Sequence, residues 1–249
     1  MTKQKAALIS IFSNSMLLVL KIGAGILMGS VSVISEAVHS GIDLLASFIA
    51  YFSIRKSVVP ADVDHPYGHG KYENISGFAE ALLIFMAAGM IVYEAAKKFL
   101  HPAEVERLDW GIVVMLVSVV VNIVVSVNLF RIAKREKSIA LEADAMHLSI
   151  DVFTSVGVLV GLIAIRFTGL TILDPIIALL VAALILKASW DLTRKSLDDL
   201  ADKTLPEAET ALIQDVVKSH PQVYGFHKLR SRKSGYQRSS MCTSRLSGT

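Results

Sequence analysis

Two short stretches of the sequence repeat one pair of chemically active residues at the same spacing. His39 stands four residues before Asp43, and His147 stands four residues before Asp151. In an α-helix, residues i and i+4 share a face, so each pair would point an imidazole and a carboxylate in one direction. Two such helices facing each other present a tetrahedral ligand set that suits Zn²⁺. The alternative, hydrogen bonding between helices, accounts for one such pair more readily than for two.

The elements that carry both pairs are long apolar runs. Of the 249 residues, 53% are hydrophobic and only 19% are charged, which is unusual for a soluble domain. Several runs approach or exceed the ~20 residues needed to cross a bilayer. We therefore predict an all-α polytopic membrane protein. Its six transmembrane helices are expected near residues 8–28, 31–54, 76–96, 110–131, 139–167 and 174–192.

Lysine and arginine residues set the expected orientation of these spans. Nine of them fall on the side of the N-terminus and four on the opposite side, and basic residues accumulate in cytoplasmic loops. Both termini are therefore expected in the cytoplasm. With a helical rise of ~1.5 Å per residue, both His/Asp pairs lie ~12–18 Å from a membrane edge. In a hydrocarbon core about 30 Å thick, this depth is compatible with a single site near the midplane.

Other polar residues within the spans have less specific interpretations. Glu36 is a candidate for orienting the ring of His39, and Glu142 is expected to pair with the basic loop before it. Asn122 is interpreted as a helix-packing residue. Lys21 lies far enough inside the first span to need a partner, which the sequence does not identify.

The loop after the second predicted span contains a second candidate metal site. Asp62, His65 and His69 fall within eight residues, and Pro66 and Gly68 favour a turn that brings the two imidazoles together. Polar loops often contain such residues without binding an ion, so spacing alone leaves both interpretations open.

The composition changes beyond residue 200. The pattern predicts an amphipathic helix over 207–219 and a strand over 226–232, which includes His227, whereas the residues that follow show no period. We predict a six-helix transmembrane domain at 1–200 and an incomplete cytoplasmic domain at 201–249. Cys242 is the only cysteine, which excludes a disulfide framework or a thiolate cluster. The net charge of +3 gives no indication of nucleic-acid binding.

These motifs resemble the cation diffusion facilitator family of divalent-metal transporters. The most specific parts are residues 35–43, 65–71 and 142–151, and the likeness extends from residue 10 to about residue 235. The resemblance implies a homodimer of six-helix units in a lipid bilayer, here expected to be the bacterial inner membrane. Each unit would export a metal ion in exchange for protons and would carry a ferredoxin-like α/β cytoplasmic domain.

The resemblance also implies roles for individual residues. The transport site would comprise His39, Asp43, His147 and Asp151, and the loop site Asp62, His65 and His69. Histidine at the first of these positions resembles the zinc-selective branch. Of the metal-binding residues in the family's cytoplasmic domain only His227 matches, as a remnant site.

The C-terminal part departs from the family pattern, because the family's soluble domain is longer. Restoring one base after the codon of Arg238 can encode a strand of the family type. We therefore expect a truncated or frameshifted domain. Resequencing the gene and finding no frame that continues the domain would contradict this expectation.

The sequence therefore predicts a secondary transporter, not an enzyme, that exports Zn²⁺ from the cytoplasm by proton antiport. It would require no cofactor, with Zn²⁺ as substrate and as a candidate structural ligand. The alternatives are efflux of a broader range of ions (Cd²⁺, Co²⁺, Fe²⁺ or Mn²⁺), metal binding without transport, and a membrane-embedded zinc hydrolase. The hydrolase fits least, because four protein ligands leave no open coordination position on zinc.

Overall fold

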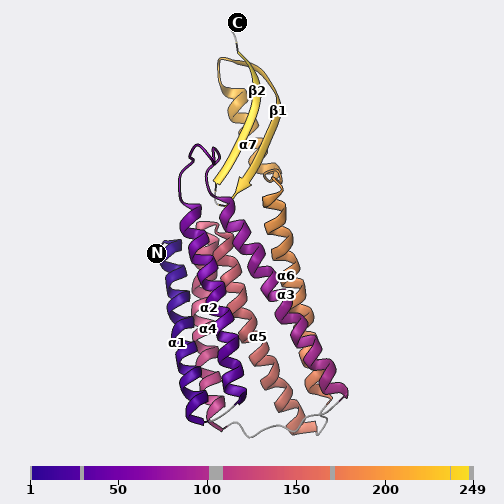
Figure 1. Ribbon diagram of the computed structural model, residues 1–249. Helices are drawn as coiled ribbons and strands as arrows, with labels where there is room; N and C mark the ends of the chain where they lie inside the picture. The colour runs from indigo at the N-terminus through magenta and orange to yellow at the C-terminus, as the bar shows by residue number, and fades with distance from the viewer. Residues whose placement is uncertain (1, 29–30, 101–108, 169–171, 236, 247–249) are drawn as a thin grey trace.

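Six long helices form most of the protein. The computed structural model describes residues 2–28, 31–100, 109–168, 172–235 and 237–246 (Figure 1). The helices are α1 (Lys3–Met28), α2 (Val31–Ser57), α3 (Lys71–Leu100), α4 (Asp109–Glu136), α5 (Ile139–Thr168) and α6 (Leu173–Leu200). They confirm the predicted all-α membrane architecture.

The surface of this bundle is apolar, as contact with lipid requires. Among the described residues, α1, α2, α3, α4 and α6 each contain a stretch long and apolar enough to cross a membrane. The remaining long helix, α5, has 30 residues, or about 45 Å, and carries the second His/Asp pair. Side chains such as Phe12, Val19, Phe52 and Leu184 are more than half exposed. Exposure of so many large apolar groups is favourable in a bilayer and costly in water.

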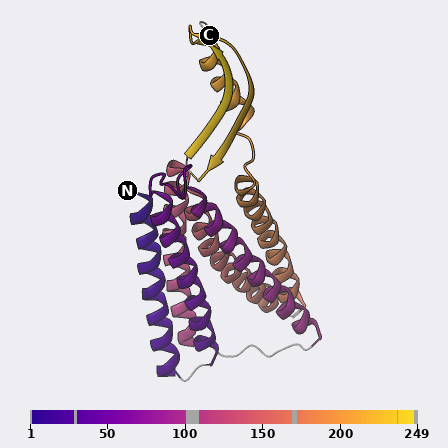
Figure 2. The same ribbon diagram turned by 45° about the horizontal axis from the view of Figure 1, so that its top comes forward.

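The helices pack as neighbouring pairs. α1 packs on α2, α4 on α5, and α3 on α6, and Figure 2 shows α3 and α6 running together and diverging from α1 and α2 at one end. Each helix extends beyond its predicted span, most clearly where α1 begins at Lys3, where α3 begins at Lys71 and where α6 ends at Leu200. Hydropathy detects only the apolar part of a helix, so the polar turns at the helix ends were not predicted.

A small C-terminal unit continues from α6. It comprises α7 (Glu207–Ser219), β1 (Val223–Ser234) and β2 (Gln237–Leu246), and it lies at the end of the bundle where α1 begins, which we call the hairpin end (Figure 1). The predicted helix over 207–219 is confirmed, and the predicted strand lies within the longer β1.

The residues that follow the predicted strand, which show no period in the sequence, continue the C-terminal unit over 237–246. These residues form β2, which pairs antiparallel with β1 from Ser234–Gln237 to Val223–Leu246. Gly235 supplies a positive φ of 59° at the turn, a conformation that glycine adopts at little cost. Backbone pairing of this kind needs no apolar alternation, so the sequence pattern did not reveal it.

α5 is the central helix of the bundle at the hairpin end. Leu141, Ala145 and Leu148 pack in a buried cluster with residues of α1, α2 and α4, whereas Ala143 and Ile150 belong to a second cluster with α3 and α6. Burial on both sides holds α5 in a defined rotation. Its His/Asp pair therefore takes a fixed direction within the bundle.

Candidate metal centre within the helix bundle

The structure brings the two His/Asp pairs together between α2 and α5. Nε2 of His39 lies 3.5 Å from Oδ1 of Asp151 and 3.9 Å from Oδ1 of Asp43. Nε2 of His147 lies 3.0 Å from the same Asp43 oxygen. His39, Asp43 and Asp151 each offer one ligand atom within 4.8 Å of the others. Each of the two helices therefore supplies one imidazole and one carboxylate to a common centre.

The centre is buried on one side and accessible on the other. Asp43 and His147 are 4% and 5% exposed, whereas the side chain of His39 is 37% exposed. His39 and Asp151 line a cavity of about 80 Å³, together with Lys21, Ser118 and Thr154. Because Ser118 lies near the start of α4 and Thr154 follows Asp151 along α5, this cavity lies on the side away from the hairpin end.

The ring of His147 has one nitrogen in contact with Asp43 and one without a hydrogen bond. Nδ1 is buried and has no hydrogen-bond partner among the described residues. Nε2 lies 3.0 Å from Oδ1 of Asp43. A proton or a metal ion between these two atoms would contact both of them. Imidazole nitrogen and carboxylate oxygen are borderline and hard donors that suit zinc and similar divalent ions.

Two contacts around the centre went beyond the sequence interpretation. Asn122 of α4 donates a hydrogen bond from Nδ2 to Oδ2 of Asp151 at 3.3 Å, so it orients a candidate ligand as well as packing. Lys21 donates to Oγ of Ser40 at 2.8 Å, one residue beyond His39. The sequence signal for this role of Asn122 was its depth in the span. A polar side chain inside the bilayer is energetically costly unless it forms a functional or hydrogen-bonded contact.

Two other expectations about nearby carboxylates have different outcomes. Glu142 pairs with Lys195 of α6, so its predicted pairing with the preceding basic loop is wrong. An ion-pair partner nearby in sequence can be predicted from local periodicity. A partner on another helix, such as Lys195, depends on how the helices pack. The side chain of Glu36 lies outside the described residues.

Buried carboxylates continue from the centre toward the hairpin end. Oδ1 of Asp144 accepts a hydrogen bond from Ser47 at 2.9 Å, and Oε1 of Glu80 accepts one from Ser76 at 3.1 Å. Both residues are fully buried. Their second oxygens have no hydrogen-bond partner in the described part of the chain. Polar groups therefore extend through the bundle from the centre toward the start of α3.

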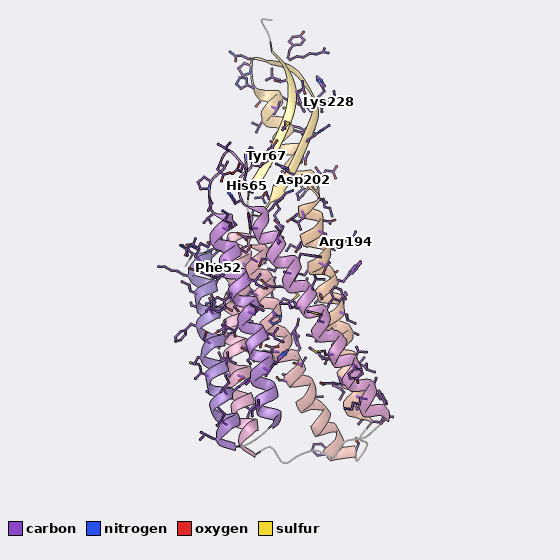
Figure 3. The ribbon with its side chains drawn as sticks, in the orientation of Figure 1. Phe52, His65, Tyr67, Arg194, Asp202 and Lys228 are labelled. Carbon is purple, nitrogen blue, oxygen red and sulfur yellow. The ribbon has the colours of Figure 1, made fainter. Side chains whose placement is uncertain are left out.

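The loop residues also cluster. Oxygens of Asp62 lie 3.4 Å from Nδ1 of His65 and 3.4 Å from Nε2 of His69, and the two rings are 4.4 Å apart. The backbone N–H of His65 donates to Asp62 at 2.7 Å and lowers the pKa of its carboxyl, an effect that the two imidazoles reinforce. The loop lies at the hairpin end (Figure 3), where the guanidinium of Arg232 lies 3.8 Å from the ring centroid of Tyr67 and pairs with Asp202.

The last predicted ligand is separate from both clusters. His227 lies on β1 opposite Thr243 of β2. Neither group of metal-type side chains found among the described residues includes it. The structure thus assembles seven of the eight predicted ligands into two groups and leaves His227 apart.

The fold and the centre define a class of protein. It is an integral membrane protein whose helices enclose imidazole and carboxylate groups at mid-depth, where such groups usually serve ion passage. Residues 7–201 match the cation efflux transmembrane domain. The chain belongs to the cation diffusion facilitator family of transporters.

Several bacterial proteins are similar over most of this chain. An uncharacterized transporter from Synechocystis sp. is 37% identical, with 88% of this chain and 71% of the relative covered. The cation-efflux pump FieF of Shewanella oneidensis is 33% identical, covering 88% of this chain and 74% of the relative. FieF of Citrobacter koseri is 32% identical, covering 93% and 77%.

Proposed function

We propose that the protein exports Zn²⁺ from the cytoplasm in exchange for protons. The observation that carries this proposal is the convergence of His39, Asp43 and Asp151 within 4.8 Å, with His147 3.0 Å from Asp43. The relatives named cation-efflux pumps support the direction of transport. Two imidazoles and two carboxylates complete a tetrahedral zinc site with small adjustments of their side chains.

The contact between His147 and Asp43 suggests how protons are coupled to the ion. A metal ion binds only neutral imidazole and ionised carboxylate, so it competes with protons for these groups. Without metal, a proton on Nε2 of His147 is stabilised by Asp43 at 3.0 Å. Zinc entering between the two atoms displaces that proton, and reprotonation on the other side of the membrane releases the ion. An unperturbed imidazole titrates near pH 6.5, within the range of physiological gradients.

The two sides of the centre suit alternate access. The cavity beside His39 and Asp151 opens away from the hairpin end, whereas Asp144 and Glu80 lie toward it. The distribution of Lys and Arg supports a cytoplasmic hairpin end in the bacterial inner membrane. We propose that ions enter along the buried carboxylates and leave through the cavity, in a homodimer of two such chains.

Flux into inside-out vesicles tests the proposal. Zn²⁺ uptake should require the protein and should increase when the vesicle interior is acidic relative to the exterior. His39→Ala and Asp151→Ala should each reduce uptake at least about tenfold, since loss of even an outer contact typically costs 10- to 100-fold. Both variants should still insert normally. His227→Ala is the matched control, because it removes an imidazole outside both clusters.

The outcomes separate the competing functions. Zinc binding without uptake would indicate a metal-binding protein that does not transport. Uptake that ignores the pH gradient would exclude antiport, and wild-type uptake by both site variants would refute the site. Faster uptake of Cd²⁺, Co²⁺, Fe²⁺ or Mn²⁺ than of Zn²⁺ would replace the zinc assignment with a broader one.

A further inference from the structure

A cleft separates the helix bundle from the C-terminal unit at the hairpin end. It has a volume of about 510 Å³ and is lined by residues of α4, α5, α6, α7, β1 and β2. Phe130, Ile139 and Leu205 give it apolar walls, and five basic side chains reach it from different elements. The basic residues are Lys134, Lys137, Lys195, Lys233 and Arg238.

The charges of the cleft do not balance. Among the residues that the structure describes, only two carboxylates line it, and each already has a basic partner: Glu142 pairs with Lys195, and Glu209 accepts from Nη2 of Arg238 at 3.0 Å. The hydrogen bond from Arg238 lowers the pKa of Glu209, and the nearby charge of Lys137 adds to the effect.

Of the three further lysines that line the cleft, two provide the excess positive charge. Lys233 pairs at 3.1 Å with Asp199, which does not line the cleft. Lys134 and Lys137 form no ion pair in the described part of the chain. Both are exposed. The cleft therefore contains positive charge that a ligand could neutralise without displacing an existing pair.

The position of the cleft indicates the type of ligand. The apolar stretches of α4 and α6 end at Glu136 and Leu200, so Lys134, Lys137 and Lys195 stand where the chain leaves the hydrocarbon core. Lipid phosphates lie at this depth. Basic pockets between helices at this boundary bind anionic headgroups, and apolar walls add contact with the glycerol and upper acyl chain. A free phosphate ion would gain nothing from the apolar walls.

We propose that this cleft binds the phosphate headgroup of an anionic phospholipid. Lys134 and Lys137 contact the phosphate through charge-assisted hydrogen bonds, while Phe130 and Ile139 contact the lipid's apolar part. The bound lipid then bridges α4 and α5 to the C-terminal unit. The lipid composition of the membrane thereby affects how firmly that unit is attached.

Thermal unfolding of the full chain in neutral detergent tests this proposal. The midpoint temperature is titrated with phosphatidylglycerol, phosphatidylcholine or inorganic phosphate, for the wild type and for Lys134→Gln/Lys137→Gln. The control Lys5→Gln/Arg131→Gln removes two exposed basic charges from the hairpin end, outside the cleft. Native mass spectrometry of the same proteins counts bound lipids independently of stability.

We expect phosphatidylglycerol to stabilise the wild type and the control equally. The apparent affinity for phosphatidylglycerol should fall roughly 10- to 30-fold in Lys134→Gln/Lys137→Gln, because each basic residue near the membrane surface contributes about 1 kcal/mol to binding. The variant should also retain fewer bound lipids. An equal loss in the control would overturn the assignment to the cleft. Equal stabilisation by phosphatidylcholine or by inorganic phosphate would overturn the anionic lipid as ligand.

Discussion

Single contacts determine how the candidate centre is organised. Asp43 contacts both imidazoles, at 3.0 Å to His147 and 3.9 Å to His39, and it is the more buried of the two carboxylates. Asp151 faces the cavity and takes its second contact from Asn122. The two aspartates therefore have different surroundings, although they occupy equivalent positions in the repeated motif.

Replacing Asn122 with leucine should weaken metal binding without removing a ligand. The hydrogen bond from Nδ2 orients the Asp151 carboxylate, and loss of such supporting contacts typically costs about tenfold or more in metal affinity. Zinc binding to the purified protein measures the effect. Asn128→Leu, on the same helix, is the matched control and should bind normally. An unchanged affinity in Asn122→Leu would show that Asp151 needs no orientation from α4.

His39→Asp should change which ions are carried. Imidazole favours Zn²⁺ over harder ions such as Mn²⁺, and three carboxylates with one imidazole discriminate less. Competition of Mn²⁺ and Fe²⁺ with zinc uptake should therefore increase relative to the wild type. The more exposed position of His39 allows a shorter side chain there without a buried void. The same order of competition in the variant would place selectivity elsewhere.

At the scale of elements, the loop between α2 and α3 is a compact unit. Gly68 adopts a φ of 76° and its N–H donates to the carbonyl of His65 at 2.9 Å, which closes the turn. The Asp62 carboxylate faces both imidazoles and the N–H of His65. Local hydrogen bonds therefore assemble this cluster independently of the helices that carry the other one.

Metal binding by this loop should be lost on acidification because of its histidines. The lowered pKa of Asp62 keeps its carboxylate ionised from pH 7.5 to 5.5, and imidazole binds a metal ion only in its neutral form. Zinc affinity should fall roughly 10- to 100-fold across this range. The measurement uses His39→Ala/Asp151→Ala, so that the bundle site does not contribute.

Asp62→Asn separates the contribution of the carboxylate to zinc binding from that of the two imidazoles. It should weaken zinc binding at both pH values and preserve most of the decrease between them, because both histidines remain. Binding that does not depend on pH in the parent variant would exclude imidazole ligands in this loop.

At the scale of the whole molecule, a dense set of contacts joins the bundle to the C-terminal unit. Lys71 pairs with Asp202 at 2.9 Å, and Arg232 pairs with Asp202 at 3.0 Å while covering the ring of Tyr67 at 3.8 Å. The hydrogen bond from Lys71 lowers the pKa of Asp202. The backbone N–H of Gly235 also donates to Asn74 of α3 at 3.0 Å.

Gly70→Ala should loosen this junction. A Cβ at Gly70 would lie 2.3 Å from the carbonyl oxygen of Ser234, so the β1–β2 hairpin must move away. We expect a loss of about 1–3 kcal/mol in its attachment, seen as faster amide hydrogen exchange over residues 223–246. Gly89→Ala, within α3, is the control, since a Cβ there meets no atom within 4 Å. Unchanged exchange in Gly70→Ala would show that the hairpin adapts without loosening.

The sequence by itself determined the features that depend on periodicity. A spacing of four residues places an imidazole and a carboxylate on one helical face, whatever surrounds the helix. Apolar length identified the long helices, and turn-forming residues indicated the loop cluster. The seven residues of the two clusters could therefore be named in advance, because both the helical repeat and the turn are local properties of the chain.

Only the tertiary structure determined the contacts between residues of different elements. The contact of Asn122 with Asp151, the pairing of Glu142 with Lys195, and the close approach of Gly70 to Gly235 each join residues far apart in sequence. The separation of His227 from both clusters has the same origin. Such contacts depend on the rotation and packing of the helices against one another. These in turn depend on the volumes and burial of side chains from the whole chain.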